Sequence, residues 1–377
     1  MSTQDPLASL EGYLEQDPEN ASLLAEVVSV AFETGRPERA ERLLERAGPA
    51  LLSDPAVSHA KAMLLLSRQR FDEAAALLGD LIARGVTAPQ VRFNLAYARF
   101  RQGKFLDAAE AFQALVSLGD APVESLSYLL RCLHHAGELD HALAAWDAAG
   151  ERLKTAQALG VASLICLDAN RLEQARDLAQ RSLGDPAAPV EAMVTRATIA
   201  VGEGNDALAE GLLDRAVARA PGDGRVWSAI AAARMGRGDL PGAEQAFVET
   251  TRHMPAHIGS WHGLAWCQLL RRDLAGAQSS FETALTLDRN FGETHGGLAV
   301  VAALHGRTAE ARQAIERAQR LDRNGLSARY AEAILAGEAS DPRAVQALAA
   351  RLLRDRPAMN GQAILERALA ARSAAKR

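Results

Sequence analysis

An alanine that returns at a fixed interval constrains this sequence more than any other feature. Successive copies are 34 residues apart, with a single interval of 33 between Ala142 and Ala175. The nine positions are Ala40, Ala74, Ala108, Ala142, Ala175, Ala209, Ala243, Ala277 and Ala311. A period of this length predicts a stack of similar units, none of which buries its apolar surface alone.

Other positions repeat with the alanine and indicate what each unit is. A small residue stands twelve positions before it in seven of the nine periods, and Leu, Ile, Phe or Trp stands four positions after it in eight. Five positions before it stand six glycines and Asn170, residue types that tolerate a positive φ where a helix ends. The pattern predicts a hairpin of two helices whose small residues let the backbones approach closely.

The best-defined units begin near residues 224 and 258 and carry their leading tryptophans at Trp227 and Trp261. Each carries a leading Trp, a small residue, an internal Ala and a Phe, and Pro221 and Pro255 stand where the preceding units end. On these residues the chain resembles the tetratricopeptide repeat family, although many units lack that family's Tyr and several lack its Pro. The resemblance implies an all-α fold, a right-handed superhelical solenoid of antiparallel helix pairs.

The register predicts nine tandem repeats of 33 or 34 residues over 21–325. Residues 1–20 are expected to form a half-repeat that caps the N-terminal end, and 326–377 a degenerate repeat with a capping helix from about residue 358. Every Gly- or Pro-containing stretch falls at a turn of the repeat, so we expect one continuous array. The 33-residue interval near Lys154 marks the expected irregularity.

Composition and motifs exclude several classes of function. A net charge of −5 argues against nucleic acid as the main partner. The three cysteines lack disulfide or zinc-site spacing, and no P-loop, HExxH or GxSxG motif occurs. We therefore expect no cofactor, no metal and no enzymatic activity. Without a leader or a run of eighteen apolar residues, we also expect no membrane span and a cytoplasmic location.

In tetratricopeptide arrays the first helix of each pair lines a concave groove that commonly receives a peptide. The outward positions of the first helices near 89 and 123 combine aromatic rings with Asn and Arg, which suit apolar groups, amides and carboxylates. The predicted peptide-binding residues are Phe93, Asn94, Tyr97, Arg101, Tyr128, Arg131 and His135. The alternative for the aromatic residues is packing against neighbouring helices.

A secondary groove candidate consists of His262 and Trp266, for which packing is again the alternative. Nearby glycines such as Gly263 and Gly297 leave room either for a ligand or for tight helix crossings. A clamp for acidic chaperone tails, known in some relatives, is not expected. Asn94 matches its central Asn, but His59, Met63, Glu124 and Tyr128 replace the other residues at the flanking positions.

The sequence therefore predicts a protein-protein interaction scaffold or adaptor that holds a peptide or protein segment in its groove, with a homodimer as a further possibility. One alternative is a specificity subunit for a separate enzyme such as a glycosyltransferase. Another is an accessory subunit of a bacterial secretion, pilus or envelope machine. The repeat pattern alone does not distinguish these partners.

Overall fold

The computed structural model describes residues 5–338, and every regular element among them is a helix. By contact density the chain divides into two compact units, Met1–Ala169 and Asn170–Arg377, which are described separately. The first unit contains α1 (Pro6–Gln16), α2 (Ala21–Glu33), α3 (Pro37–Arg46), α4 (Pro49–Leu52), α5 (Pro55–Ser67), α6 (Phe71–Ala83), α7 (Pro89–Arg101), α8 (Phe105–Val116), α9 (Ser125–His135), α10 (Leu139–Ala148), the 3-10 turn η1 (Glu151–Leu153) and α11 (Ala156–Asp168).

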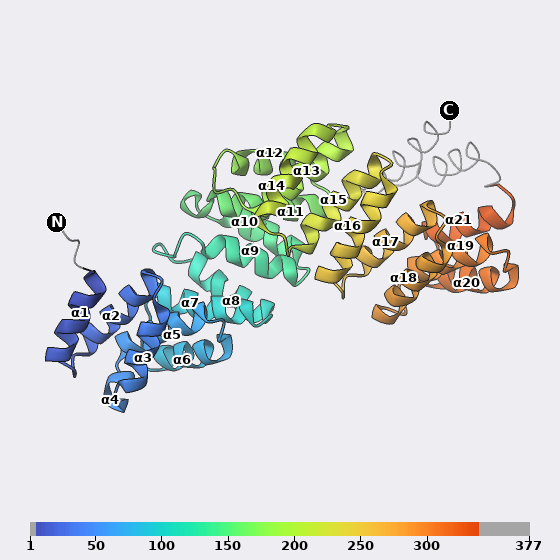
Figure 1. The fold of residues 1–377 in the computed structure, drawn as a ribbon. Coiled ribbons are helices and arrows are strands. Elements are labelled where there is room, and N and C mark those ends of the chain that lie inside the picture. Colours follow the sequence, from blue (N-terminus) through green and yellow to red (C-terminus); the bar gives the residue numbers. More distant parts are fainter. Residues whose placement is uncertain (1–4, 339–377) are drawn as a thin grey trace. The chain divides into compact units, whose positions relative to one another are not determined.

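The second unit contains α12 (Leu172–Leu183), α13 (Val190–Glu203), α14 (Asp206–Arg219), α15 (Gly224–Gly236), α16 (Leu240–His253), α17 (Ile258–Leu270), α18 (Leu274–Leu287), α19 (Gly292–Leu304), α20 (Thr308–Leu321) and α21 (Leu326–Leu335). Within each unit consecutive helices run back and forth as antiparallel pairs (Figure 1). The predicted all-α architecture of tandem helix pairs is confirmed.

The recurring alanine lies where the helices of a pair approach each other. Each of the nine copies is at most 1% exposed to solvent. The bulky residue four positions later lies on the same side of its helix, as Phe112 and Phe281 do, and both of these rings are fully buried. Close packing of this kind tolerates little added volume, so the alanine fixes the spacing of each pair.

A residue with positive φ follows the first helix of each of the nine described repeats. The glycine and asparagine positions that the sequence indicates have this conformation, with φ from 58° at Asn170 to 81° at Gly238. Gln69 and Arg272 occupy the same position with φ of 59° and 67°. The turn geometry is therefore kept even where the residue type is unfavourable, because the helices on either side impose it.

Helix starts are capped by short polar side chains. Asp239 and Asp273 accept hydrogen bonds from the backbone N–H of Gly242 and Gly276, at 3.0 and 2.9 Å. Glu293 of α19 reaches 33 residues along the chain, where its carboxylate accepts the backbone N–H of Leu326 at 2.6 Å. The first turn of α21 is thus held by the preceding repeat.

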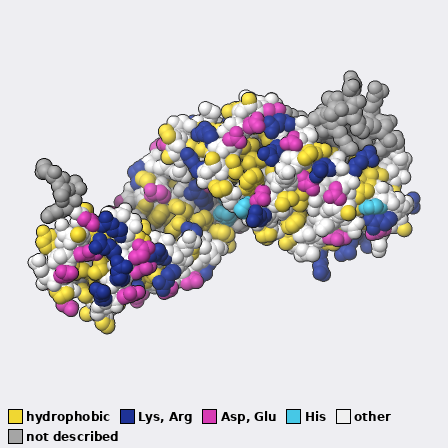
Figure 2. Space-filling view, in the orientation of Figure 1, with side chains coloured by type: hydrophobic (Ala, Val, Ile, Leu, Met, Phe, Trp, Pro, Cys, Tyr) yellow, Lys and Arg dark blue, Asp and Glu magenta, His cyan; other side chains and the backbone are white. Residues whose placement is uncertain are grey.

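Exposed helix faces in the first unit carry mixed charges. Figure 2 shows basic and acidic side chains next to one another over α1–α5. Arg68 pairs with Glu38 and Glu41, at 2.9 Å in each case, and thereby links the end of α5 to α3. Such exposed pairs contribute little to stability but keep these faces solvated.

Two expectations concern the chain ends and the membrane. The capping helix near residue 358 lies outside the described residues. The division into 1–20, 21–325 and 326–377 stays a prediction. Among residues 5–338, no helix is both long enough and apolar enough to cross a membrane.

Candidate peptide-binding surface

Four of the predicted residues of α7 and α9, Phe93, Tyr97, Tyr128 and His135, take part in one cluster of rings. Phe93, Tyr97 and Phe100 recur every three or four positions, so they project from one side of α7. We define the aromatic cluster as Phe93, Tyr97, Phe100, Phe105, Phe112, Tyr128 and His135. Phe112 is fully buried, His135 is exposed and the others are half-buried, so the cluster extends from the core to the surface.

Tyr128 is the centre of the aromatic cluster. Its ring meets Tyr97 and Phe100 edge-on, with centroids 5.4 and 5.6 Å apart. It stacks on Phe112 at 5.6 Å with an interplanar angle of 16°. Burial raises the pKa of the Tyr128 hydroxyl above its ordinary value. The rings therefore form a rigid apolar surface that also carries the hydroxyl groups of Tyr97 and Tyr128.

Two guanidinium groups lie over rings of this region. The Arg101 guanidinium carbon is 4.4 Å from the centroid of Phe71, and one of its nitrogens donates to the Tyr97 hydroxyl at 2.8 Å. The Arg131 guanidinium carbon is 5.5 Å from the centroid of Tyr128. These contacts place two positive charges beside the rings, where a carboxylate of a partner would meet both charge and apolar surface.

Asn94 differs from the sequence expectation that it faces a ligand. It is 3% exposed, and its side-chain amide is already engaged. The amide nitrogen lies 3.1 Å from His59 Nε2 and 2.8 Å from Met63 Sδ, while the oxygen accepts from Gln90 at 3.2 Å. Asn94 therefore joins α7 to α5, because a buried amide must satisfy its hydrogen bonds.

The histidines near the cluster have separate partners. His135 stacks on Phe105 at 4.7 Å with an interplanar angle of 13°. His134 Nε2 lies 2.6 Å from an Asp168 oxygen, and His141 Nδ1 lies 2.9 Å from a Glu138 oxygen. Within residues 5–338 no three His, Cys, Asp or Glu side chains are grouped so that they could hold a metal.

The secondary candidate is engaged in packing. His262 Nε2 lies 2.8 Å from Thr294 Oγ1, and the ring meets Phe281 edge-on at 5.3 Å. Burial lowers the pKa of His262 to about 4. Trp266 lies between Phe281 and Tyr330, at 6.2 and 6.1 Å. These contacts fit the packing alternative, and a role in binding stays a prediction.

Gly263 and Gly297 serve tight helix crossings. A Cβ atom at Gly263 would lie 2.3 Å from the Phe247 ring, and one at Gly297 would lie 2.4 Å from the Phe281 ring. The two contacts are the same contact one repeat apart, since each ring precedes its glycine by sixteen residues. Of the two interpretations left open by the sequence, the structure selects close packing at both positions.

The three cysteines are buried and unpaired with one another. Burial raises the pKa of the Cys132 thiol to about 12 and that of Cys267 to about 11. Thiols with these pKa values stay protonated and unreactive at neutral pH.

Two members of this surface were missed in the sequence. Phe71 and Phe105 stand three residues before Ala74 and Ala108, at the start of a second helix. That position lies across the turn from the last residues of the first helix, so its side chain reaches the groove residues. The signal was an aromatic residue at this position in two adjacent repeats.

Comparison with known proteins agrees with the geometry of the helix pairs. Family models of the tetratricopeptide repeat match residues 4–64, 59–122, 93–153 and 263–325. The chain is a tetratricopeptide repeat protein. Members of this family are typically interaction scaffolds that bind protein partners. No curated protein matches the sequence.

Solved structures share the tetratricopeptide fold. A chain of the APC/C hetero-tetramer Cut9-Hcn1 matches at 13% identity with a TM-score of 0.60, over 84% of this chain. This protein spans only 63% of that chain's length. A human IFIT1 dimer with m7Gppp-AAAA matches at 14% identity with a TM-score of 0.55, over 98% of this chain and 95% of that one. At these identities the likeness concerns the fold alone.

Proposed function

We propose that this tetratricopeptide repeat protein is a non-catalytic scaffold that holds a segment of a partner protein against α7 and α9. The observation that carries the proposal is the aromatic cluster, which is half-exposed and lies next to two guanidinium groups. Rigid rings beside arginine are the residue types that dominate the binding energy of protein interfaces. The first helices of a tetratricopeptide array are also those that commonly face a peptide.

The partner segment, in this proposal, carries a large apolar side chain and a carboxylate. The half-buried edges of Phe93, Phe100 and Tyr128 suit an apolar side chain, since their rings are held by one another. The edges of Arg101 and Arg131 suit the carboxylate, because a guanidinium forms two parallel hydrogen bonds with it. A charge-assisted pair next to an apolar contact fixes both the position and the direction of a bound segment.

An immobilised peptide array tests the proposal directly. It would contain peptides in which one aromatic or leucine residue is combined with an acidic residue at varied spacing. Binders selected with the full chain are then measured in solution by fluorescence anisotropy. We expect the double substitution Arg101→Ala/Arg131→Ala to weaken binding at least about tenfold, which corresponds to about 1.4 kcal/mol.

The matched control is Arg42→Ala/Arg46→Ala, which removes the same charge from exposed positions of α3 in the same unit. Its affinity is expected to stay within about twofold of the unchanged protein, as for surface changes away from a contact. Circular dichroism verifies that both variants are folded. Equal affinities for the two double variants would refute this location for the site.

A further inference from the structure

One side-chain position recurs in the last three full repeats of the second unit and forms the same hydrogen bond in each. Trp227 and Trp261 donate their indole N–H to the backbone oxygens of Pro221 and Pro255, at 2.8 Å in both cases. One period later stands His295, whose Nε2 lies 2.9 Å from the backbone oxygen of Arg289. A carbonyl oxygen only accepts, so Nε2 carries the proton. Histidine thus keeps the bond that tryptophan forms.

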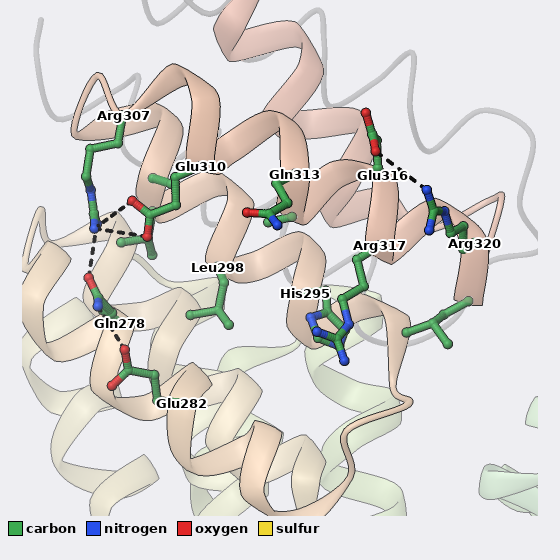
Figure 3. Close-up of a pocket in the computed structure, with 14 residues that line it drawn as sticks. Gln278, Glu282, His295, Leu298, Arg307, Glu310, Gln313, Glu316, Arg317 and Arg320 are labelled. Carbon is green, nitrogen blue, oxygen red and sulfur yellow. Dashed lines mark hydrogen bonds and ion pairs between the residues drawn. The ribbon is translucent and has the colours of Figure 1, made fainter.

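The histidine side chain is smaller than tryptophan and does not fill the same volume. An indole extends beyond its five-membered ring by a fused six-membered ring, whereas an imidazole ends there. Beside Trp227, between α14 and α15, the open space measures about 130 Å³. At the equivalent place two repeats later, His295 borders a cavity of about 720 Å³ between α18, α19 and α20 (Figure 3). The cavity is far larger than the missing ring.

Most charges around the cavity are already paired. Arg307 and Glu310 of α20 form an ion pair at 3.0 Å, and Arg320 and Glu316 approach to 3.7 Å (Figure 3). At the α18 side, Glu282 accepts a hydrogen bond from the Gln278 amide at 2.8 Å. These contacts leave each carboxylate of the cavity wall with a donor.

Arg317 is different from the other arginines of the cavity. It is exposed, it lines the cavity together with His295, and within the described part of the chain it forms no hydrogen bond or ion pair. In Figure 3 the two side chains are drawn at the same end of the cavity. A guanidinium without a partner next to an open space is the group that a carboxylate would bind, through two parallel hydrogen bonds.

The inner wall of the cavity is apolar. Leu298, Val301 and Ala302 of α19 line it, and the His295 ring borders the same space. These groups suit the flat surface of an aromatic ring, which stacks or packs edge-on against imidazole and aliphatic carbons. A volume of about 720 Å³ also falls in the range of small-ligand sites, roughly 300–1,000 Å³.

We infer that this cavity binds a planar aromatic group that carries a carboxylate. The ring lies on α19 where the tryptophans of the preceding repeats place their indole, and the carboxylate pairs with Arg317. The ligand is either a free aromatic acid or an aromatic residue at the carboxyl end of a partner chain, since both present the same chemistry. The site belongs to the second unit and shares no residue with the aromatic cluster.

Titration calorimetry on the full chain tests the inference with two probes, indole-3-propionate and its neutral amide. The acid should bind the unchanged protein, and the amide should bind at least about fivefold more weakly. The substitution Arg317→Gln should reduce affinity for the acid to that for the amide and leave the amide unaffected. Arg312→Gln, an exposed α20 residue that does not line the cavity, should change neither affinity.

The substitution His295→Trp places in the cavity the side chain that two preceding repeats already hold. It should abolish binding of both probes while the thermal midpoint stays at or above that of the unchanged protein. A tryptophan-terminated hexapeptide that binds more tightly than indole-3-propionate identifies a partner chain end as the source, and the reverse order identifies a free acid. Undetectable binding of the acid at millimolar concentration, or equal affinities of the Arg317→Gln and Arg312→Gln variants for it, would overturn the inference.

Discussion

At the scale of single residues, the repeated small positions decide how closely the helices approach. Gly263 lies against the Phe247 ring, whereas Gly211 in α14 is exposed and a Cβ there would meet nothing within 4 Å. Both are helical glycines, so their intrinsic helix preference is the same. They differ only in the space around them.

We therefore predict opposite effects for the same substitution. Gly263→Ala should lower the free energy of unfolding by about 1–3 kcal/mol, because the Phe247 ring must move. Gly211→Ala should raise it by about 0.5–1 kcal/mol, because alanine loses less backbone freedom on folding. Denaturant titrations of the two variants give both values. A stabilised Gly263→Ala protein would contradict the packing role.

His262 gives a prediction for pH. Its pKa is about 4 in the folded protein, against an ordinary value of 6.5, because burial disfavours the charged ring. Below pH 6.5 the unfolded chain therefore binds a proton that the folded chain does not, and stability falls as the pH decreases from 6.5 toward 4. Between pH 7.5 and pH 5, His262 should lower the free energy of unfolding by about 1–2 kcal/mol.

The variant His262→Gln isolates this contribution, since glutamine retains a group that can reach the Thr294 hydroxyl. Urea midpoints of both proteins at pH 7.5 and pH 5 are compared. Only the difference between the proteins counts, because His59 is half-buried and burial lowers its pKa as well. Identical pH dependence of the two proteins would rule out His262 as the cause.

At the scale of elements, each helix pair is closed by a turn that requires positive φ. Arg272 adopts φ of 67° at the position where the preceding repeat has Gly238. A side chain with a Cβ is strained in this region by about 1 kcal/mol, whereas glycine is not. The Arg272 side chain is exposed, so little packing is lost on its removal.

Arg272→Gly should consequently stabilise the protein by up to about 0.5 kcal/mol, after subtraction of the extra freedom that glycine has in the unfolded chain. Gly238→Ala, the matched change one repeat earlier, should destabilise it by about 1 kcal/mol. Thermal unfolding followed by circular dichroism measures both shifts. If both variants moved the midpoint in the same direction, the turn argument would be wrong.

The 34-residue period of the alanine was sufficient to predict where the helices lie. It did not predict which residue type occupies each turn. Helices α5, α7 and α17 begin at Pro55, Pro89 and Ile258, where the register puts them. Two turns lacked the expected glycine because φ is set by the flanking helices and not by Arg272 or Gln69 alone. The repeat register predicted where these two turns lie, but the residue types Gln69 and Arg272 gave no sign of a positive φ.

The sequence indicated which aromatic residues share one side of α7, but it did not indicate the contacts of each side chain. The aromatic residues of α7 and α9 lie together because residues three and four apart share one side of a helix. The burial of Asn94 depends on His59 and Met63 of the preceding repeat, and helical periodicity contains no information on such contacts. The cavity at His295 is visible in the sequence only after Trp227 and Trp261 are known to share its hydrogen bond.

At the scale of the whole molecule, the described repeats form two units, each with cores of its own. Leu126 of α9 is fully buried in the first unit, and Leu264 of α17 is 5% exposed in the second. In a linear array, stability is approximately a sum of local terms, so damage spreads mainly to neighbouring repeats.

Leu126→Ala should lower the free energy of unfolding of the surrounding helices by about 2–5 kcal/mol. Hydrogen exchange should therefore increase in α7–α10, with little change in α17–α19. Leu264→Ala should show the converse pattern. Hydrogen exchange measured by mass spectrometry resolves the helices separately. Uniform loss of protection along the chain in either variant would mean that the whole array unfolds as one cooperative body.

The distribution of the tryptophans over the two units has a consequence for fluorescence measurements. The sequence contains four tryptophans, of which only Trp146 belongs to the first unit, while Trp227, Trp261 and Trp266 belong to the second. Trp146 is buried in α10, and the Lys154 ammonium lies 5.2 Å from its ring centroid. Among residues 5–338, no cation lies over the ring of the other three. Replacing Trp146 with phenylalanine would leave an emission signal that arises from the second unit alone, so each half of the protein carries its own intrinsic fluorophore.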